Sequence, residues 1–92
     1  MYSFRTTKQF DRDINKMRKL HRDLTKMDKA LDALTSNDID LLAGHYRDHK
    51  LTGALQGYRE LHIEGDWLLV YKKIKETITI VLTRTGTHDT LL

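Results

Sequence analysis

The sequence predicts an α+β domain, with two N-terminal helices followed by an antiparallel β-sheet. Two observations indicate this class. Apolar residues recur every three or four positions in the first third of the chain, which is the helical period, and short apolar or alternating runs separated by turn residues follow, as in strands. The 92 residues suffice for one domain (residues 1–92) with a single modest core.

A short strand and a helix are expected at the start. Tyr2 to Arg5 alternates aromatic and polar residues, as a short strand would. Thr6 and Gln9 form a capping box, in which each side chain satisfies a free backbone N–H of the other, so a helix should begin there. The helical period then continues, without glycine or proline, through Phe10, Ile14, Met17, Leu20, Leu24, Met27, Leu31 and Leu34.

This periodic stretch is expected to form two helices. A single helix of that length would be much longer than the mean of about a dozen residues in globular proteins. The predicted break is at Leu20 to Asp23, because Asp23 can cap a second helix that starts at Leu24. Ser36 to Asp38 favour a turn and should end that helix.

Three further strands are expected, and their short connections predict antiparallel pairing. Tyr58 to Ile63 alternates, with His62 on the side away from the apolar residues. Trp67 to Tyr71 is wholly apolar, as a strand in the middle of a sheet would be. Thr77 to Arg84 is the last predicted strand, and its alternation places four residues on one face: Ile78, Ile80, Leu82 and Arg84.

The composition favours a cytoplasmic protein. The chain has no cysteine, so disulfides and thiolate metal sites are excluded, and a reducing cytoplasm is the simplest compartment. The N-terminus does not resemble a signal peptide, and no apolar run approaches the ~20 residues of a membrane helix. We therefore expect a soluble protein with no membrane partner.

The net charge of +3 is concentrated in the first third of the chain. Residues 1–35 carry nine Lys/Arg against five Asp, whereas residues 36–92 carry seven against eight Asp/Glu. Arg12, Lys16 and Lys19 lie together on the polar face of the first predicted helix. Such a patch would favour a polyanion or an acidic protein as partner, but on charge alone an ordinary solvated helix face is the preferred interpretation.

The five histidines are the most unusual chemical feature. His49, His62 and His88 each lie at the edge of a predicted element and beside a carboxylate or an arginine in sequence, whereas His21 and His45 lack such companions. Histidine exchanges a proton near neutral pH because its unperturbed pKa is ~6.5. Together with Asp66, the first three suit general acid–base catalysis.

The same residues could in principle bind a metal. Three imidazoles and a carboxylate can ligate zinc or a redox metal, and His62 and Asp66 are four residues apart. That interval places two ligands on one face only within a helix, whereas here it crosses a predicted strand-to-turn boundary. The spacing therefore does not decide the question, and no metal or cofactor is expected.

Two motifs carry a resemblance to a known family. The stretch YRDHKLTGALQGYRELHIEGDWLLVYK, followed by RTGTH, resembles the YafQ branch of the RelE/ParE toxins, which are bacterial ribosome-dependent mRNA interferases of type II toxin–antitoxin pairs. The resemblance implies two N-terminal helices packed on a twisted antiparallel β-sheet and cleavage of mRNA in the ribosomal A site. It also implies a cognate antitoxin of the DinJ/RelB-like, ribbon-helix-helix type, through which the complex would bind operator DNA.

The resemblance also implies the site. The family's catalytic positions fall on His49, His62, Asp66 and His88. Its phosphate-binding arginine corresponds to Arg84. Two departures are present: Lys50 stands where family members often have proline, which makes the loop around His49 less rigid, and the chain ends on Leu91 and Leu92 where many members have an aromatic residue.

The chemistry follows from the groups themselves. In metal-free RNA cleavage the ribose 2′-OH attacks the adjacent phosphate, so one group must accept that proton, another must protonate the leaving 5′-oxygen, and a third must stabilise the added charge. We expect His49 with Asp66 to perform one proton transfer, His88 the other, and Arg84 to stabilise the charge. His62 would orient the phosphate or a neighbouring side chain.

Two other functions remain open from the sequence. ParE-type relatives share the fold but act on DNA gyrase without cleaving RNA, and the His/Asp set disfavours that function. A metal-dependent nuclease or hydrolase would lose its activity in EDTA and regain it with a divalent ion. In the interferase interpretation, Arg12, Lys16 and Lys19 would hold ribosomal RNA through phosphate contacts.

Overall fold

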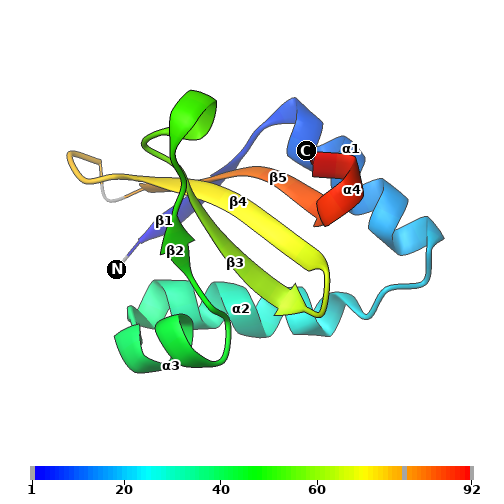
Figure 1. Cartoon of the computed structure of the whole chain (residues 1–92), viewed down its shortest axis with the longest axis horizontal. Coiled ribbons are helices and arrows are strands. Elements are labelled where there is room, and N and C mark those ends of the chain that lie inside the picture. The colour runs from blue at the N-terminus through cyan, green and yellow to red at the C-terminus, as the bar shows by residue number, and fades with distance from the viewer. Residues whose placement is uncertain (1, 78, 92) are drawn as a thin grey trace.

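The structure is a computed structural model that describes residues 2–77 and 79–91 (Figure 1). Its elements follow one another in this order: β1 (Ser3–Thr6), α1 (Lys8–Lys19), α2 (Leu24–Ser36), α3 (Ile39–Gly44), β2 (His49–Lys50), the 3₁₀ turn η1 (Gly53–Leu55), β3 (Arg59–Glu64), β4 (Trp67–Ile74), β5 (Thr79–Thr87) and α4 (His88–Leu91). The expected α+β class is confirmed.

The five strands form one sheet in the order β1-β5-β4-β3-β2. The pairs β3–β4 and β4–β5 are antiparallel, as expected. The two-residue strand β2, which was not predicted, also pairs with β3 in antiparallel fashion, but β1 pairs with β5 in parallel, so the sheet is mixed. Short connections dictate antiparallel pairing only for the strands that they join. Because most of the chain separates β1 from β5, no such constraint acts on that pair.

The two N-terminal helices are present and separate where expected. Asp23 caps α2 by accepting a hydrogen bond from the backbone N–H of Thr25 (3.1 Å). The cap of α1 is Thr7 rather than Thr6, because Thr6 is still paired with β5. The hydroxyl of Thr7 accepts from the N–H of Phe10 (3.0 Å) and donates to the carbonyl of Thr83 (2.7 Å). This cap therefore also fixes the start of α1 against β5.

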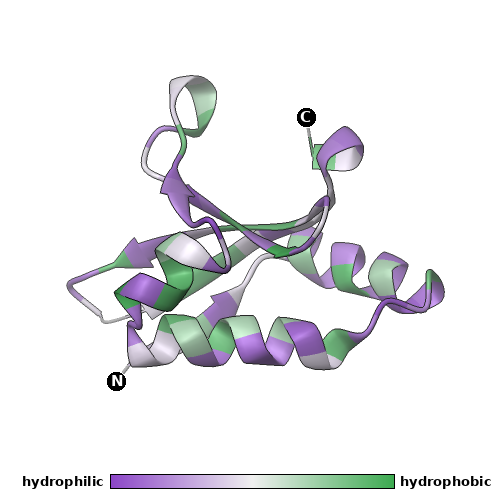
Figure 2. Cartoon of the chain, turned by 60° about the horizontal axis from the view of Figure 1, so that its bottom comes forward, coloured by the Kyte–Doolittle hydropathy of each residue, from purple (hydrophilic) through white to green (hydrophobic). Residues whose placement is uncertain are grey.

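The main core lies between the sheet and the helices. Figure 2 shows α2 and α3 on one side of the sheet, whereas η1 and α4 project from the other side. The large side chains of this core are Phe10, Met17, Met27, Leu34, Leu42, Tyr46, Leu61, Ile63, Trp67, Leu69, Tyr71, Ile80 and Leu82. On the opposite face, Leu68 and Val70 of the central strand β4 are also buried. Burial on both faces explains why the Trp67 strand is wholly apolar.

A β-bulge corrects one prediction about β5. Tyr71 pairs with Leu82, but Val70 pairs with Arg84, so Thr83 is an extra residue in β5. Successive residues of a strand point to opposite faces, and one extra residue reverses every later side chain. Arg84 therefore does not share a face with Leu82, as the alternation predicted. Ile78, the other residue assigned to that face, lies outside the described residues.

The surface of α1 agrees with its predicted polarity. Arg12, Lys16 and Lys19 are exposed. Among the described residues, no helix is both long enough and apolar enough to cross a membrane.

Candidate active site

The sheet face opposite α2 carries the polar residues that the sequence singled out. Strand register aligns one row of partners across β2, β3, β4 and β5: His49, Glu60, Val70 and Arg84. The next row on the same face consists of His62, Leu68 and Gly86. Because directly paired residues share a face, the topology brings His49, His62 and Arg84 to one side of the sheet.

His49, Glu60 and His62 form a compact cluster on this face. The Nε2 atom of His49 lies 3.6 Å from Oε1 of Glu60, and the two imidazole rings are 6.2 Å apart between centroids. The Nδ1 atom of His49 lies 2.8 Å from the carbonyl oxygen of Arg47. Since a carbonyl only accepts, Nδ1 carries the hydrogen, and in the neutral ring Nε2 is the nitrogen that can take a proton.

The carboxylate beside His49 is Glu60 and not the expected Asp66. His49 and Glu60 are ladder partners, and this register sets the short distance. The alternation predicted for Tyr58 to Ile63 also puts Glu60 on the face of His62, although Glu60 was not among the predicted site residues. The alternation of β3 was the available signal, because a carboxylate two residues before a site histidine shares its face.

Two neighbours of His49 hold this edge in place. Arg47 has a left-handed backbone (φ +50°), which is uncommon for a residue with a side chain, and its Nη2 lies 3.2 Å from Nδ1 of His62. Asp48 accepts hydrogen bonds from Nη2 of Arg59 (3.0 Å) and from the hydroxyl of Tyr71 (2.6 Å). Burial and this hydrogen bond to Asp48 raise the pKa of Tyr71 above its ordinary value. The segment before β2 is therefore anchored to β3 and β4.

Arg84 is bound by a buried carboxylate from α1. Its Nε donates to Oδ2 of Asp13 (2.9 Å) and its Nη2 to Oδ1 (3.3 Å), while its side chain remains 35% exposed. Burial acts to raise the pKa of Asp13, but hydrogen bonds from Arg84, Gln9 and Thr85 and the charge of Arg84 outweigh it, so the pKa lies below its usual value. Asp13 was missed from the sequence, although its position on the buried stripe of the helix was a signal.

Asp66 and His88 lie at the end of the sheet where β3 turns into β4 and β5 runs into α4. The backbone N–H of His88 donates to the carbonyl of Asp66 (3.2 Å). The carboxylate of Asp66 is exposed and lies 3.8 Å from Nη2 of Arg22. His62 is connected to this turn, because its Nδ1 lies 3.3 Å from the carbonyl of Gly65. These contacts place the two residues near one another but leave their catalytic roles as predictions.

His49, Glu60 and His62 are also a possible set of metal ligands. Their donor atoms lie within 4.8 Å of one another. Two imidazoles and a carboxylate with an open coordination position are typical of catalytic zinc sites. This set differs from the His62 and Asp66 combination that the sequence suggested.

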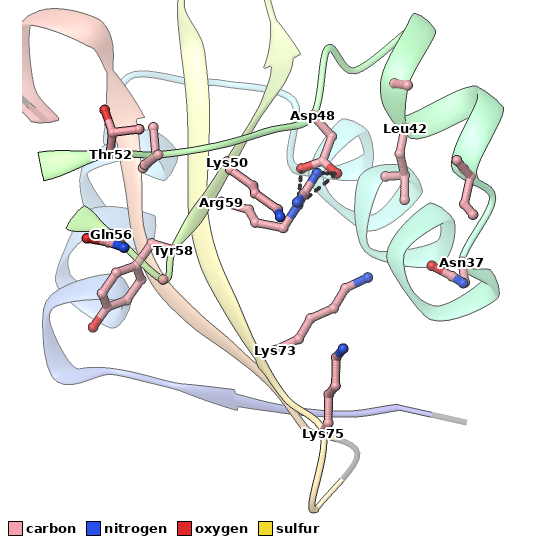
Figure 3. A pocket seen from close by; sticks show the side chains of 14 residues that line it. Asn37, Leu42, Asp48, Lys50, Thr52, Gln56, Tyr58, Arg59, Lys73 and Lys75 are labelled. Atoms are coloured by element: carbon pink, nitrogen blue, oxygen red, sulfur yellow. Dashed lines mark hydrogen bonds and ion pairs between the residues drawn. The ribbon is translucent and has the colours of Figure 1, made fainter.

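A groove of about 910 Å³ lies on the helix side of the sheet (Figure 3). It is bounded by α3, the η1 loop and the outer ends of β3 and β4. Figure 3 shows the ammonium groups of Lys73 and Lys75 extending toward the α3 side, and Lys50 also lines the groove. Among the described lining residues, Asp48 is the only acid, and it is paired with Arg59. The groove is therefore basic.

Comparison with known proteins places this chain among the toxins of type II toxin–antitoxin systems. Residues 2–92 match the model of a family described as "Bacterial toxin of type II toxin-antitoxin system, YafQ". The mRNA interferase toxin YafQ of Escherichia coli strain K12 is 37% identical over 83 residues, which cover 90% of this chain and 87% of that protein. The chain therefore belongs to the YafQ family, as the two motifs indicated.

Solved structures of similar proteins agree with the fold. YafQ from E. coli strain BL21(DE3) superimposes with a TM-score of 0.87 at 33% identity, covering 100% of this chain and 99% of that one. A metal-bound toxin from Helicobacter pylori superimposes with a TM-score of 0.89 at 37% identity, with both chains fully covered. YafQ in the E. coli DinJ–YafQ complex gives a TM-score of 0.85 at 34% identity, covering 100% and 99% of the two chains.

Proposed function

We propose that this chain is a ribosome-dependent endoribonuclease that cleaves mRNA and thereby inhibits translation. The observation that supports this most directly is the row that carries His49, Glu60 and Arg84 on one sheet face with His62 beside it. A base with its carboxylate partner and a guanidinium supply two of the three groups that metal-free RNA cleavage requires, and the third is an acid for the leaving 5′-oxygen. The similar E. coli protein is named an mRNA interferase, which agrees with the proposal.

In the proposed reaction, the 2′-oxygen attacks the adjacent phosphorus as its proton passes to a base. The bond from phosphorus to the 5′-oxygen then breaks, and an acid protonates that oxygen, leaving a 2′,3′-cyclic phosphate and a 5′-hydroxyl. Nε2 of His49 is the proposed base, with Glu60 in place of Asp66 as the carboxylate that stabilises the imidazolium. His88 is the proposed acid, and Asp66 acts beside it. No cofactor takes part.

Charge accumulates on the phosphate oxygens during this attack. The guanidinium of Arg84 lies on the same face and keeps part of its surface exposed, so it is the proposed group that stabilises this charge. His62, which contacts the guanidinium of Arg47, is proposed to orient the phosphate.

Alanine substitution tests the catalytic set. Each of the variants H49A, H62A, D66A and H88A should cut reporter mRNA on programmed ribosomes about 10² times more slowly if the residue transfers a proton. A matched control is H21N, because His21 is exposed and asparagine tolerates its left-handed backbone (φ +59°). Circular dichroism should be the same for all five variants. Unchanged cleavage in two or more of the four site variants would reject the proposal.

The gyrase-poisoning alternative predicts a different cellular outcome. If the chain cleaves mRNA on the ribosome, as proposed, primer extension on total mRNA after induction of the toxin should show discrete cuts at in-frame codons. DNA damage without such cuts would support the ParE-like function instead.

The proposed partners are the ribosome with its mRNA and a cognate antitoxin of the DinJ type. A relative is solved as a complex with DinJ, which supports the antitoxin. Operator DNA is proposed to be bound only through the antitoxin. The exposed Arg12, Lys16 and Lys19 on α1 are the proposed contacts to ribosomal RNA.

A second candidate activity is binding of a transition-metal ion by His49, Glu60 and His62. The compact donor set supports it, and the similar H. pylori toxin is described as metal-bound. The Nδ1–H of His49 already donates to the carbonyl of Arg47, which is how metal-binding histidines are commonly oriented. Such an ion would occupy the Nε2 atom that the proposed base needs, so it should inhibit cleavage.

Calorimetric titration with Cu²⁺ and Zn²⁺ tests this candidate. The wild type should bind one ion, and E60Q should bind it at least about tenfold more weakly, since second-shell or ligand changes in such sites commonly cost that much. A chelator that removes Cu²⁺ and Zn²⁺ but leaves the Mg²⁺ that intact ribosomes need should leave mRNA cleavage unchanged or raise it. Loss of cleavage with this chelator and recovery with one of the two ions would instead establish a metal-dependent nuclease.

A further inference from the structure

Asp13 is a buried charge on α1 that reaches β5 across 71 positions of sequence. Its side chain is only 3% exposed. Four donors surround its two oxygens: Oδ2 accepts from Nε of Arg84 (2.9 Å) and the backbone N–H of Thr85 (3.1 Å), and Oδ1 accepts from Nε2 of Gln9 (3.1 Å) and Nη2 of Arg84 (3.3 Å). A carboxylate with this many donors has little freedom to move.

The local topology explains why the carboxylate of Asp13 lies beside β5. β1 covers β5 only as far as Leu82, so the rest of β5 has an open edge. The N–H of Thr85 lies on this edge and would lack a partner, and Asp13 supplies one. The bulge at Thr83 turns the next residue, Arg84, to the face of His49 and His62. Asp13 thus binds the backbone of β5 and the side chain of Arg84 at the same point.

We propose that Asp13 is a positioning residue for the RNA-cleavage reaction and acts through Arg84. The carboxylate binds one edge of the guanidinium, formed by Nε and Nη2, in a bidentate contact that fixes its plane. Within the described part of the chain, the contact with Asp13 uses one N–H of Nε and one of Nη2. A guanidinium has five N–H groups, so the two of Nη1 and the second of Nη2 lie outside this contact, and with the side chain 35% exposed they are available to a phosphate. The inference rests on the proposed function, because it assigns α1 a part in the same site.

The proposed positioning role of Asp13 requires the geometry of both side chains, the carboxylate of Asp13 and the guanidinium of Arg84. Lysine at position 84 would keep the charge but could not make the bidentate contact, and asparagine at position 13 would keep the shape but offer one oxygen instead of two. A guanidinium displaced by about 1 Å loses much of its effect on the transition state, and such displacements cost up to ~10² in rate. Substrate binding through other surfaces should be retained.

The test is a double-mutant cycle on cleavage of ribosome-bound mRNA. D13N should lower kcat by roughly 10- to 100-fold with KM within about twofold of the wild type, because positioning affects the chemical step. In the R84A background, D13N should have no further effect on kcat, because the residue through which Asp13 acts is already absent. Gln9→Ala, which removes one hydrogen bond of Asp13 and leaves the ion pair, should lower kcat by a smaller factor and should also have no effect in R84A.

Several results would overturn the inference. If D13N cleaves with the kcat of the wild type, Asp13 has no part in the reaction. If D13N lowers kcat by the same factor in the wild-type and R84A backgrounds, Asp13 acts through folding and not through Arg84. If D13N does not fold, the Gln9→Ala cycle decides by the same criterion. A fully active R84A variant would reject this inference and the role of Arg84, while the histidine variants would still decide whether the chain is a nuclease.

Discussion

At the scale of single residues, the site depends on groups that bind one another before any substrate is present. Asp48 shows this most clearly. Its carboxylate accepts from Arg59 and from the hydroxyl of Tyr71, and the next residue is His49 at the start of β2. A two-residue edge strand has little stability of its own. The Asp48 contacts therefore supply much of the rigidity that places His49 beside Glu60.

Tyr71→Phe should reveal this contribution. The variant keeps the buried ring but removes the hydroxyl that donates to Asp48 at 2.6 Å, and we expect a loss of about 1–2 kcal/mol in the free energy of unfolding. Tyr58→Phe is the matched control, because among the described residues the Tyr58 hydroxyl makes no hydrogen bond; it should change stability by less than about 0.5 kcal/mol. Urea unfolding measures both. Equal stability of the wild type and Y71F would contradict this account of Asp48.

At the scale of elements, local patterns predicted β1, α1, α2, β3, β4 and β5 to within a few residues, but not the short elements β2 and α4 or the contacts between distant segments. The break at Asp23 and the buried strand at Trp67 follow from nearby residues, and both are present. The bulge at Thr83 depends on how β4 and β5 pair, and the period of β5 alone cannot show it. The same is true of Asp13, whose partners are remote in sequence. The site histidines were found from motifs, but Glu60 became a neighbour of His49 only through the register of β2 and β3.

The contact between α1 and β5 should make stability depend on acidic pH. The folded-state pKa of Asp13 is lowered, so its contribution is present above the unfolded-state pKa of about 3.9 and is lost as the pH falls through the folded-state value. D13N should therefore be less stable than the wild type by about 1–3 kcal/mol at pH 6, and the difference should shrink below about pH 4. Urea unfolding at pH 6 and pH 3 measures it, with D28N, at an exposed position, as the control. A difference that is the same at both pH values would contradict the assignment.

At the scale of the whole molecule, the sheet separates two surfaces of different chemistry. The face with His49, His62 and Arg84 lies opposite α2, whereas the groove beside α3 opens on the helix side. Lysines line this groove together with Ile39, an apolar side chain that is 67% exposed. The basic residues of α1 form a third region, near the other end of the helix layer (Figure 1). The two partners proposed above, the ribosome and the antitoxin, can therefore bind separate surfaces.

The basic groove fits an acidic partner segment that also carries apolar side chains, and we expect the antitoxin to supply it. Reversing Lys73 and Lys75 to glutamate should weaken binding of the proposed cognate antitoxin by about 10- to 100-fold, and more strongly at low salt, because charge reversal converts attraction into repulsion. Co-sedimentation of this variant with ribosomes should be unchanged.

Reversing Lys16 and Lys19 on α1 should have the opposite pattern, weakening ribosome binding in a salt-dependent way and leaving antitoxin affinity within about twofold. Each double variant is the other's control for net charge, so a loss of both interactions in both variants would show only a general electrostatic effect and would reject the division into two surfaces.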